Sequence, residues 1–265
     1  MRKYKGLENK NILVVEDVEL NQYLAKHIME SWGCVVEIVE NGALAIDKIN
    51  EKDFDIVLMD IQMPVMDGLQ ATKMIRGMED TYKSSIPVVA LTANAARGEY
   101  DVYLKSGMND CLAKPFEEGS LFKTVLKNIR KDKVAPVTEI KKQEIINAEP
   151  AAPKSYDLTM VETISGGDQS FVAKMLRLFL DTVPVTLNEI NAAATSSNWL
   201  QLSKLAHKLK STIDSMGIIE LKQDIRFIEN NSKSGEDPDA IHAAVQKVNA
   251  VMNEVMKQVK KDHSL

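Results

Sequence analysis

The chain has little of three things that would each indicate a particular class of protein. Only two of its 265 residues are cysteine, and neither Cys34 nor Cys111 has metal-ligand or redox spacing, so both are interpreted as small buried residues of a reducing compartment. Positive charge is in deficit, with 33 Lys and Arg against 38 Asp and Glu, which disfavours nucleic-acid binding because that requires clustered basic residues. Apolar runs are short, and the one that follows the basic start, Ile12–Val15, ends at Glu16. We therefore expect a cytoplasmic protein with no secretion signal and no membrane insertion.

Length and patterning predict two domains joined by a linker. A chain of 265 residues is long enough for two domains that each bury a core. Over residues 10–130, short apolar runs alternate with helical periods, which is typical of an α/β doubly wound domain with a five-stranded parallel sheet. Residues 131–155 lose this periodicity and are rich in Lys, Glu, Ala and Pro, as a flexible linker would be. Over residues 156–265 every long segment has a helical period, which predicts an all-α helical bundle.

The helices of both domains can be placed from their apolar stripes. The first has a stripe that includes Leu24, Ile28 and Trp32, and it should end at Gly33. His27 lies off this stripe and is interpreted as an exposed residue with no chemical role. Pro184 should kink the second helix of the bundle. The remaining helices are expected over residues 43–51, 69–76, 98–106 and 120–131 in the first domain, and over 158–164, 168–194, 199–216, 220–232 and 239–260 in the second.

Polar side chains follow four of the predicted strands at the point where each strand ends. They are Glu16 and Asp17 after the first strand, Asp60 after Ile56–Met59, Thr92 after Val88–Leu91, and Lys114 with Pro115 after Cys111–Ala113. Because ligands of open parallel sheets bind outside the carboxyl ends of the strands, these side chains should converge on one crevice. Three carboxylates, a hydroxyl and a lysine are the groups that a divalent cation and a phosphoryl group would together require.

The order, spacing and strand-end placement of these residues resemble the receiver domain of two-component response regulators, over roughly residues 10–130. The loops Met63–Pro64 and Asp67–Gly68 add to the resemblance. It implies a flavodoxin-like fold in which Asp60 is phosphorylated. Since a carboxylate is a weak nucleophile, its attack on phosphorus needs charge neutralisation rather than a general base. Lys114 would then pair with the phosphoryl oxygens, and the Thr92 hydroxyl would bind one of them after transfer.

The same resemblance implies a Mg²⁺ site and a cis peptide bond. Asp17, Asp60 and the backbone carbonyl of Gln62 would hold the ion, and Glu16 would act through water. The bond before Pro115 is expected to be cis, as Lys-Pro is at this position of the family.

Two positions argue against other interpretations of this acidic site. Receivers commonly carry an aromatic residue three positions before the conserved lysine, whereas this chain has Cys111. That departure disfavours signalling through an aromatic switch and suits a receiver that passes phosphate onward. A phosphatase of the haloacid-dehalogenase type would need a second aspartate two positions after Asp60 as its general acid, and Gln62 stands there. A further alternative is that Asp60 only caps a turn, but the matching positions of the other strand-end residues would then be a coincidence.

A histidine in the helical half has a signature of its own. Ser203, His207, Lys210, Ser211 and Asp214 are expected on the exposed face of their helix, opposite an apolar stripe. The string around His207 is similar to that of histidine-containing phosphotransfer (HPt) domains, in which a lysine sits three residues after the active histidine, as Lys210 does. The family usually has glycine where Ser211 stands, which leaves room for the partner's aspartate loop.

The two resemblances together imply the C-terminal part of a hybrid sensor histidine kinase. No kinase domain is apparent, so Asp60 would accept a phosphoryl group from an external histidine kinase and pass it through His207 to a downstream response-regulator receiver. The alternative is an adaptor in which phosphorylation of Asp60 only gates docking, and the helical bundle is a non-catalytic binding domain. The two differ in whether His207 carries phosphate.

Overall fold

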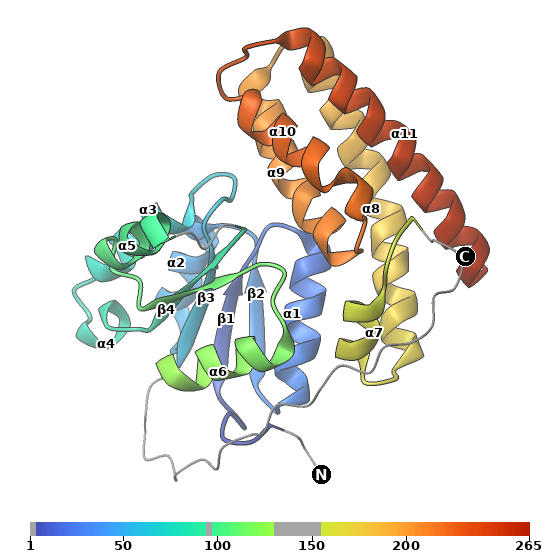
Figure 1. Ribbon diagram of the computed structural model, residues 1–265. Coiled ribbons are helices and arrows are strands. Elements are labelled where there is room, and N and C mark those ends of the chain that lie inside the picture. Colours follow the sequence, from blue (N-terminus) through green and yellow to red (C-terminus); the bar gives the residue numbers. More distant parts are fainter. Residues whose placement is uncertain (1–3, 94–96, 130–154) are drawn as a thin grey trace.

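A parallel sheet flanked by helices is followed along the chain by a bundle of helices in the computed structural model, which describes residues 4–93, 97–129 and 155–265 (Figure 1). The linker expected over residues 131–155 lies outside the described residues except for Ser155. The first domain contains β1 (Asn11–Val15), α1 (Glu19–Ser31), β2 (Val35–Val39), α2 (Gly42–Glu51), β3 (Ile56–Asp60), α3 (Gly68–Arg76), α4 (Thr81–Ser84), β4 (Val88–Thr92), α5 (Arg97–Lys105), β5 (Asp110–Ala113) and α6 (Glu118–Asn128).

The sheet has the doubly wound topology that the sequence predicts. Its strand order is β2-β1-β3-β4-β5, and every neighbouring pair is parallel. β3 and β4 are buried along their whole length because helices cover both faces of the sheet. Alternate residues of each strand face the two sides: Ile12 and Val14 belong to the core under α1 and α6, whereas Leu13 and Val15 belong to the core under α2, α3 and α5.

Short local signals explain where two of the helices begin. Asp67 caps α3, since its carboxylate accepts the backbone N–H of Gln70 at 2.8 Å. The four-residue helix α4 was not predicted, because it is too short to show a helical period; it begins where Asp80 accepts two backbone N–H groups.

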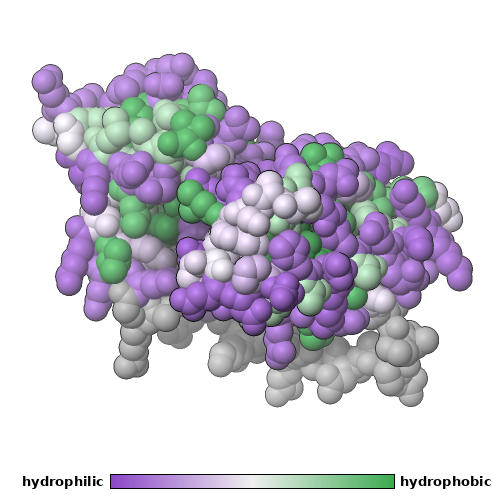
Figure 2. Space-filling view, turned by 90° about the horizontal axis from the view of Figure 1, so that it is seen from above, coloured by the Kyte–Doolittle hydropathy of each residue, from purple (hydrophilic) through white to green (hydrophobic). Residues whose placement is uncertain are grey.

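The second domain is all helical, as predicted. It contains α7 (Thr159–Ser165), α8 (Gln169–Thr195), α9 (Trp199–Ser215), a 3₁₀ turn η1 (Ile219–Leu221), α10 (Lys222–Asn231) and α11 (Pro238–His263). α8 runs as one helix through Pro184. Buried residues such as Phe179, Leu187 and Val248 form the centre of the bundle. No helix among the described residues is both long and apolar enough to cross a membrane. Hydrophilic residues cover most of the face of the molecule seen in Figure 2.

The two domains pack against each other through α1 and α8. The rings of Tyr23 and His27, on α1, stack on Phe171 of α8 with centroid distances of 5.0 and 3.9 Å. The core under α1 and α6 is therefore continuous with the core of the bundle. The expectation that His27 is exposed was wrong, because this contact leaves its side chain half-buried.

Candidate phosphotransfer site

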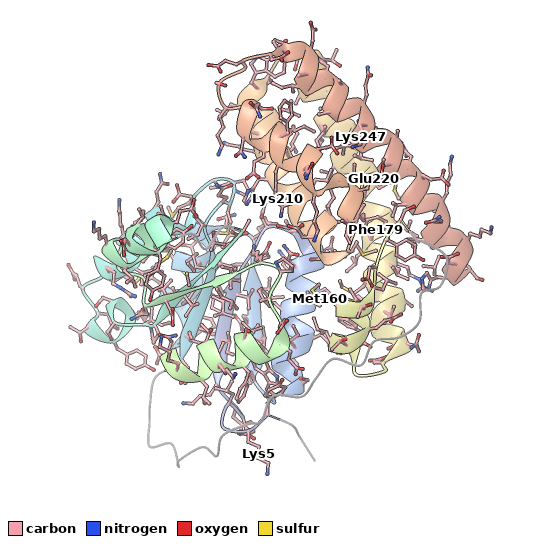
Figure 3. All side chains as sticks on the ribbon, viewed as in Figure 1. Lys5, Met160, Phe179, Lys210, Glu220 and Lys247 are labelled. Atoms are coloured by element: carbon pink, nitrogen blue, oxygen red, sulfur yellow. The ribbon has the colours of Figure 1, made fainter. Side chains whose placement is uncertain are left out.

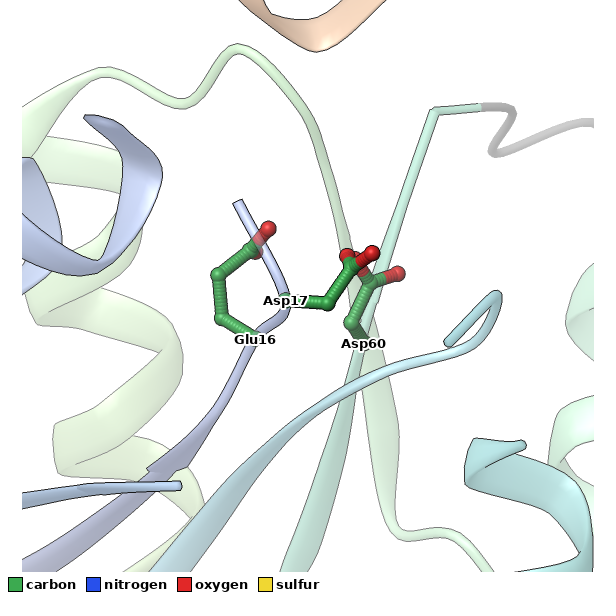
Figure 4. Close-up of side chains that lie close together, drawn as sticks. All are labelled: Glu16, Asp17 and Asp60. Atoms are coloured by element: carbon green, nitrogen blue, oxygen red, sulfur yellow. The ribbon is translucent and has the colours of Figure 1, made fainter. Parts of the chain in front are cut away.

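Three carboxylates meet at the carboxyl ends of the central strands. Glu16 and Asp17 follow β1 and Asp60 ends β3, so the parallel sheet brings them together (Figure 4). Oxygen atoms of the three groups lie within 4.8 Å of one another. Burial, and to a lesser extent the neighbouring Asp60, raise the pKa of Glu16 to about 7 and raise the pKa of Asp17. This donor set suits a hard divalent cation such as Mg²⁺, which would offset the repulsion among the carboxylates.

The ammonium group of Lys114 contacts two of these carboxylates. Its Nζ lies 2.5 Å from Glu16 Oε2 and 2.5 Å from Asp60 Oδ2, and its side chain is 8% exposed. Burial alone would lower the pKa of Lys114, but Asp60 and Glu16 outweigh it and raise that pKa. The ammonium group is therefore held charged beside Asp60. The Lys114–Pro115 peptide bond is cis, as the sequence predicts.

The loop after β3 closes over Asp60. The backbone N–H of Gln62 donates to Asp60 Oδ1 at 3.3 Å, so the Gln62 backbone lies beside the acidic cluster. Gly68 returns the chain toward the strand, donating from its N–H to the Ile61 carbonyl at 3.0 Å. A Cβ at Gly68 would stand 2.1 Å from the Asp60 carbonyl oxygen, which explains why this position holds glycine.

Thr92 reaches the same crevice from β4 and contacts an aromatic residue that sequence reasoning missed. Its Oγ1 lies 3.0 Å from the Tyr103 hydroxyl, which donates to Glu99 Oε2 at 3.0 Å. Burial is the largest cause that raises the pKa of Tyr103 to about 12. An aromatic hydroxyl thus approaches Thr92 from α5, while Cys111 on β5 is only partly buried. Tyr103 could have been suspected from its helical spacing to Glu99.

His207 belongs to a second cluster of charged side chains. Its Nδ1 lies 2.6 Å from Glu229 Oε1, and Lys210 Nζ lies 2.5 Å from Glu229 Oε2 and 3.4 Å from His207 Nδ1. Burial would raise the pKa of Glu229, but the hydrogen bonds from His207 and Lys210 outweigh it and lower that pKa to about 2. An ionised carboxylate only accepts hydrogen bonds, so Nδ1 must donate, and Nε2 of the neutral ring carries the lone pair.

Asp60, from the acidic cluster, and the residues of the histidine cluster line one cavity. This cavity, of about 290 Å³, is bordered by Asp60, Gln62 and Thr92 on the sheet side and by His207, Lys210 and Glu229 on the bundle side. Figure 3 shows Lys210 on the part of the bundle that faces the upper edge of the sheet. The structure therefore brings together residues that the sequence places more than a hundred positions apart.

Comparison with known proteins identifies the two halves. Residues 12–126 match the response regulator receiver domain family, and residues 174–260 match the Hpt domain family. The chain is a receiver domain followed by an Hpt domain. That combination is the composition of a phosphorelay module.

Sensor kinases are among the relatives that the chain matches over most of its length. The chain is 29% identical over 256 residues to the signal transduction histidine-protein kinase BarA of Escherichia coli K12, covering 94% of this chain and 27% of BarA. It is 33% identical over 212 residues to the sensor protein GacS of Pseudomonas syringae pv. syringae, covering 80% of this chain and 23% of GacS. The chain thus spans about a quarter of the length of these relatives.

A solved structure is similar to the receiver domain. It is the receiver domain of the sensor histidine kinase PA1611 from Pseudomonas aeruginosa PAO1, described with a magnesium ion coordinated in the active site cleft. The match has 38% sequence identity and a TM-score of 0.42, and covers 45% of this chain and 96% of that one.

The surroundings of His207 correct one prediction from the sequence. Its helix face was expected to be exposed, yet the residues of that face are buried or nearly so: the His207 side chain is 13% exposed, and Ser203, Lys210, Ser211 and Asp214 are all below 9%. α10 of the Hpt domain covers one side, where Ser203 Oγ donates to the Glu229 carbonyl at 2.7 Å. On the other side, receiver residues such as Asp60 and Thr92 border the cavity that His207 lines. Glu229 itself was missed, because its role depends on the packing of α10 against α9.

Proposed function

We propose that the chain relays a phosphoryl group from an upstream histidine kinase to Asp60, then to His207, and then to the aspartate of a downstream receiver. The observation that supports transfer between Asp60 and His207 is the shared cavity of about 290 Å³, which has these two residues on its two sides. The domain boundaries that go with this proposal are residues 10–130, 131–155 and 156–265, and the protein would act in the cytoplasm.

The first step is attack by an Asp60 carboxylate oxygen on the phosphorus of an upstream phosphohistidine. A P–O bond forms, the P–N bond breaks, and the electron pair returns to the imidazole of the kinase. Asp17, Asp60 and the Gln62 carbonyl would hold Mg²⁺, with Glu16 acting through water. When bound, the ion would neutralise charge on the carboxylates and on the phosphoryl oxygens.

Lys114 and Thr92 would receive the phosphoryl group. Lys114 Nζ, now 2.5 Å from Asp60 Oδ2, can exchange that carboxylate oxygen for a phosphoryl oxygen, because phosphorylation removes the negative charge of Asp60. The Thr92 hydroxyl lines the same cavity and would donate to a second oxygen.

In the second step, Nε2 of His207 would attack the phosphorus of the acyl phosphate. The new P–N bond forms as the bond to the Asp60 oxygen breaks, and Asp60 leaves as a carboxylate. The Nδ1 proton stays in place, donated to Glu229 at 2.6 Å, so the positive charge that develops on the ring faces a carboxylate. Lys210, 3.4 Å from Nδ1, would pair with the phosphoryl oxygens.

The relay is tested by following label through two variants of the full chain. With a radiolabelled upstream kinase, Asp60→Asn should block label from reaching either domain, whereas His207→Gln should trap it as base-labile acyl phosphate. His242→Gln is a matched control, since that histidine contacts backbone carbonyls of the bundle, away from the cavity. If the His207→Gln protein passes phosphate to a downstream receiver at the wild-type rate, the adaptor alternative is the better one.

A further inference from the structure

The contact between α1 and α8 is built around one aromatic side chain. Phe171, in the first turn of α8, is 1% exposed and meets two rings of the receiver. Tyr23 stacks on it with an interplanar angle of 17°, and His27, one turn further along α1, stacks at 27°. Lys174 adds a cation over the Tyr23 ring, 4.5 Å from its centroid. Stacked rings and a cation–π contact make this interface specific as well as apolar.

A second contact between the two domains lies closer to the proposed phosphotransfer site. A cavity of only about 20 Å³ separates the receiver loop Lys114–Phe116 from Ser211 and Asp214 of α9. α1 touches both α8 and α9, so the same helix that carries Tyr23 also borders the histidine helix. The α1–α8 contact therefore fixes where His207 stands relative to Asp60.

We propose that the α1–α8 contact is the docking interface for transfer within one molecule, and that the chain's own receiver competes through it with downstream receivers for the Hpt domain. This rests on the proposed relay. While the receiver is docked, the His207 side chain is 13% exposed and its cavity is bordered by Asp60. The aspartate of a second receiver cannot reach the same Nε2 at the same time. The receiver of this chain must leave before His207 can deliver phosphate.

The chemistry of the interface defines the partner. A receiver that displaces the resident one must present an aromatic side chain on its first helix, where Tyr23 stands, to Phe171 and Lys174. Because one chain carries both domains, the resident receiver has an effective concentration on the order of millimolar, which a free partner at lower concentration has to overcome. Docking in the same molecule thus favours transfer onto His207 and opposes transfer away from it.

The test uses variants of the two-domain chain, with radiolabelled acetyl phosphate as the phosphoryl donor in the presence of Mg²⁺. In the wild type, phosphohistidine should form from phospho-Asp60 at a rate per molecule that does not change on dilution. For transfer between molecules, the His207→Gln chain is phosphorylated as the donor and mixed with the Asp60→Asn chain, whose His207 is the acceptor.

Tyr23→Ala should then change the rate of transfer between molecules in opposite directions in the two chains. In the acceptor chain it releases the resident receiver and should raise transfer by about three- to tenfold, the range expected for one aromatic contact. In the donor chain it weakens docking on the foreign Hpt domain and should lower transfer by a similar factor. His27→Ala should repeat both effects more weakly. Lys26→Ala is the control on the same helix, because its side chain is 45% exposed and pairs with Glu30.

Each outcome decides between docking and its alternatives. A wild-type rate that falls in proportion to concentration overturns transfer within one molecule. A Tyr23→Ala effect of the same sign in both chains shows a structural role for Tyr23 and overturns the competition. If no phosphohistidine forms in the wild type or in the mixed pair, the relay itself fails, which is a different result from either of these.

Discussion

The two sites that we propose to accept phosphate have opposite charge balances. Around Asp60, three carboxylates, of which that of Asp17 is only partly buried, face one ammonium group, that of Lys114. Around His207, one carboxylate, that of Glu229, is matched by Lys210 and by the donated Nδ1–H. The receiver site is therefore short of positive charge, and we propose that a divalent cation completes it. In the Hpt site, the charges of Glu229 and Lys210 balance without a bound cation. Phosphate acceptance there requires only the ring tautomer of His207 that has its proton on Nδ1.

Removal of the divalent cation should have the largest effect on the site around Asp60. Labelling of Asp60 by acetyl phosphate should require Mg²⁺ or Mn²⁺, because the carboxylates of Glu16, Asp17 and Asp60 otherwise repel the incoming anion. Excess chelator should reduce acyl phosphate formation to the background of Asp60→Asn. Transfer from a phosphorylated upstream kinase should show the same requirement. Full labelling in chelator would contradict a metal site here.

Removal of Lys114 should have the next largest effect. Lys114→Ala takes away the one ammonium group within 2.5 Å of Asp60 in the described structure. Asp60 phosphorylation should slow by about 10²–10³-fold, as when one preorganised charge-stabilising group is lost. The measurement is the initial rate of labelling at saturating Mg²⁺. Lys127→Ala is the control, since that lysine is 69% exposed and pairs with Asp110; an equal effect in both variants would remove Lys114 from the site.

Glu229→Gln tests the balanced site. An amide has one acceptor oxygen where the carboxylate has two, so it cannot serve both His207 and Lys210. Transfer from phospho-Asp60 to His207 should fall by about tenfold to a hundredfold, the cost of a lost hydrogen bond between charged groups. Labelling of Asp60 itself should not change. Glu220→Gln, at an exposed position of η1, should leave both steps intact.

The lowered pKa of Glu229 predicts a pH dependence of the stability of the protein, and the same variant tests it. The pKa of Glu229 is lowered to about 2 in the folded protein from an ordinary value of 4.5, so its ionised form stabilises the fold above pH 4.5. That contribution is lost as the pH falls from 4.5 toward 2. The difference in Tm between wild type and Glu229→Gln should therefore be constant near neutral pH and narrow in acid. A difference that widens in acid would mean that Glu229 does not carry this stability.

Gly68→Ala should disturb the receiver site through its backbone. The added Cβ would stand 2.1 Å from the Asp60 carbonyl oxygen, so the loop has to move. The free energy of unfolding should fall by about 1–3 kcal/mol, typical of overpacking, and Asp60 labelling should slow. Gly77→Ala, where the nearest atom is 3.5 Å away, is the matched control for denaturant unfolding. Similar losses in both variants would show that the close approach at Gly68 is not what requires glycine.

The same contrast explains what the sequence could predict. The residues around Asp60 follow strands, and a parallel sheet aligns the ends of its strands whatever the details of side-chain packing. Glu16, Asp17, Asp60, Thr92 and Lys114 could therefore be placed together from their positions alone. Glu229, Tyr103 and the burial of the His207 face depend on which helices pack together, and helical periodicity does not specify that. The stacking of His27 on Phe171 was missed for the same reason.

Substitution of Ser211 should have the smallest effect of these variants. Ser211 stands where HPt domains usually have glycine, which leaves room for the partner's loop. In the structure Ser211 is 7% exposed and lines the small cavity beside Lys114 and Pro115, so a hydroxymethyl group fits at the docked interface. Ser211→Gly should thus leave transfer from Asp60 to His207 within about twofold of wild type, while costing about 0.5 kcal/mol of stability because glycine is a poorer helix former than serine. Single-turnover rates and denaturant unfolding would measure the two effects. A marked acceleration would mean that the serine side chain holds the domains too far apart, and that the Hpt site is limited by docking distance and not by the state of its histidine.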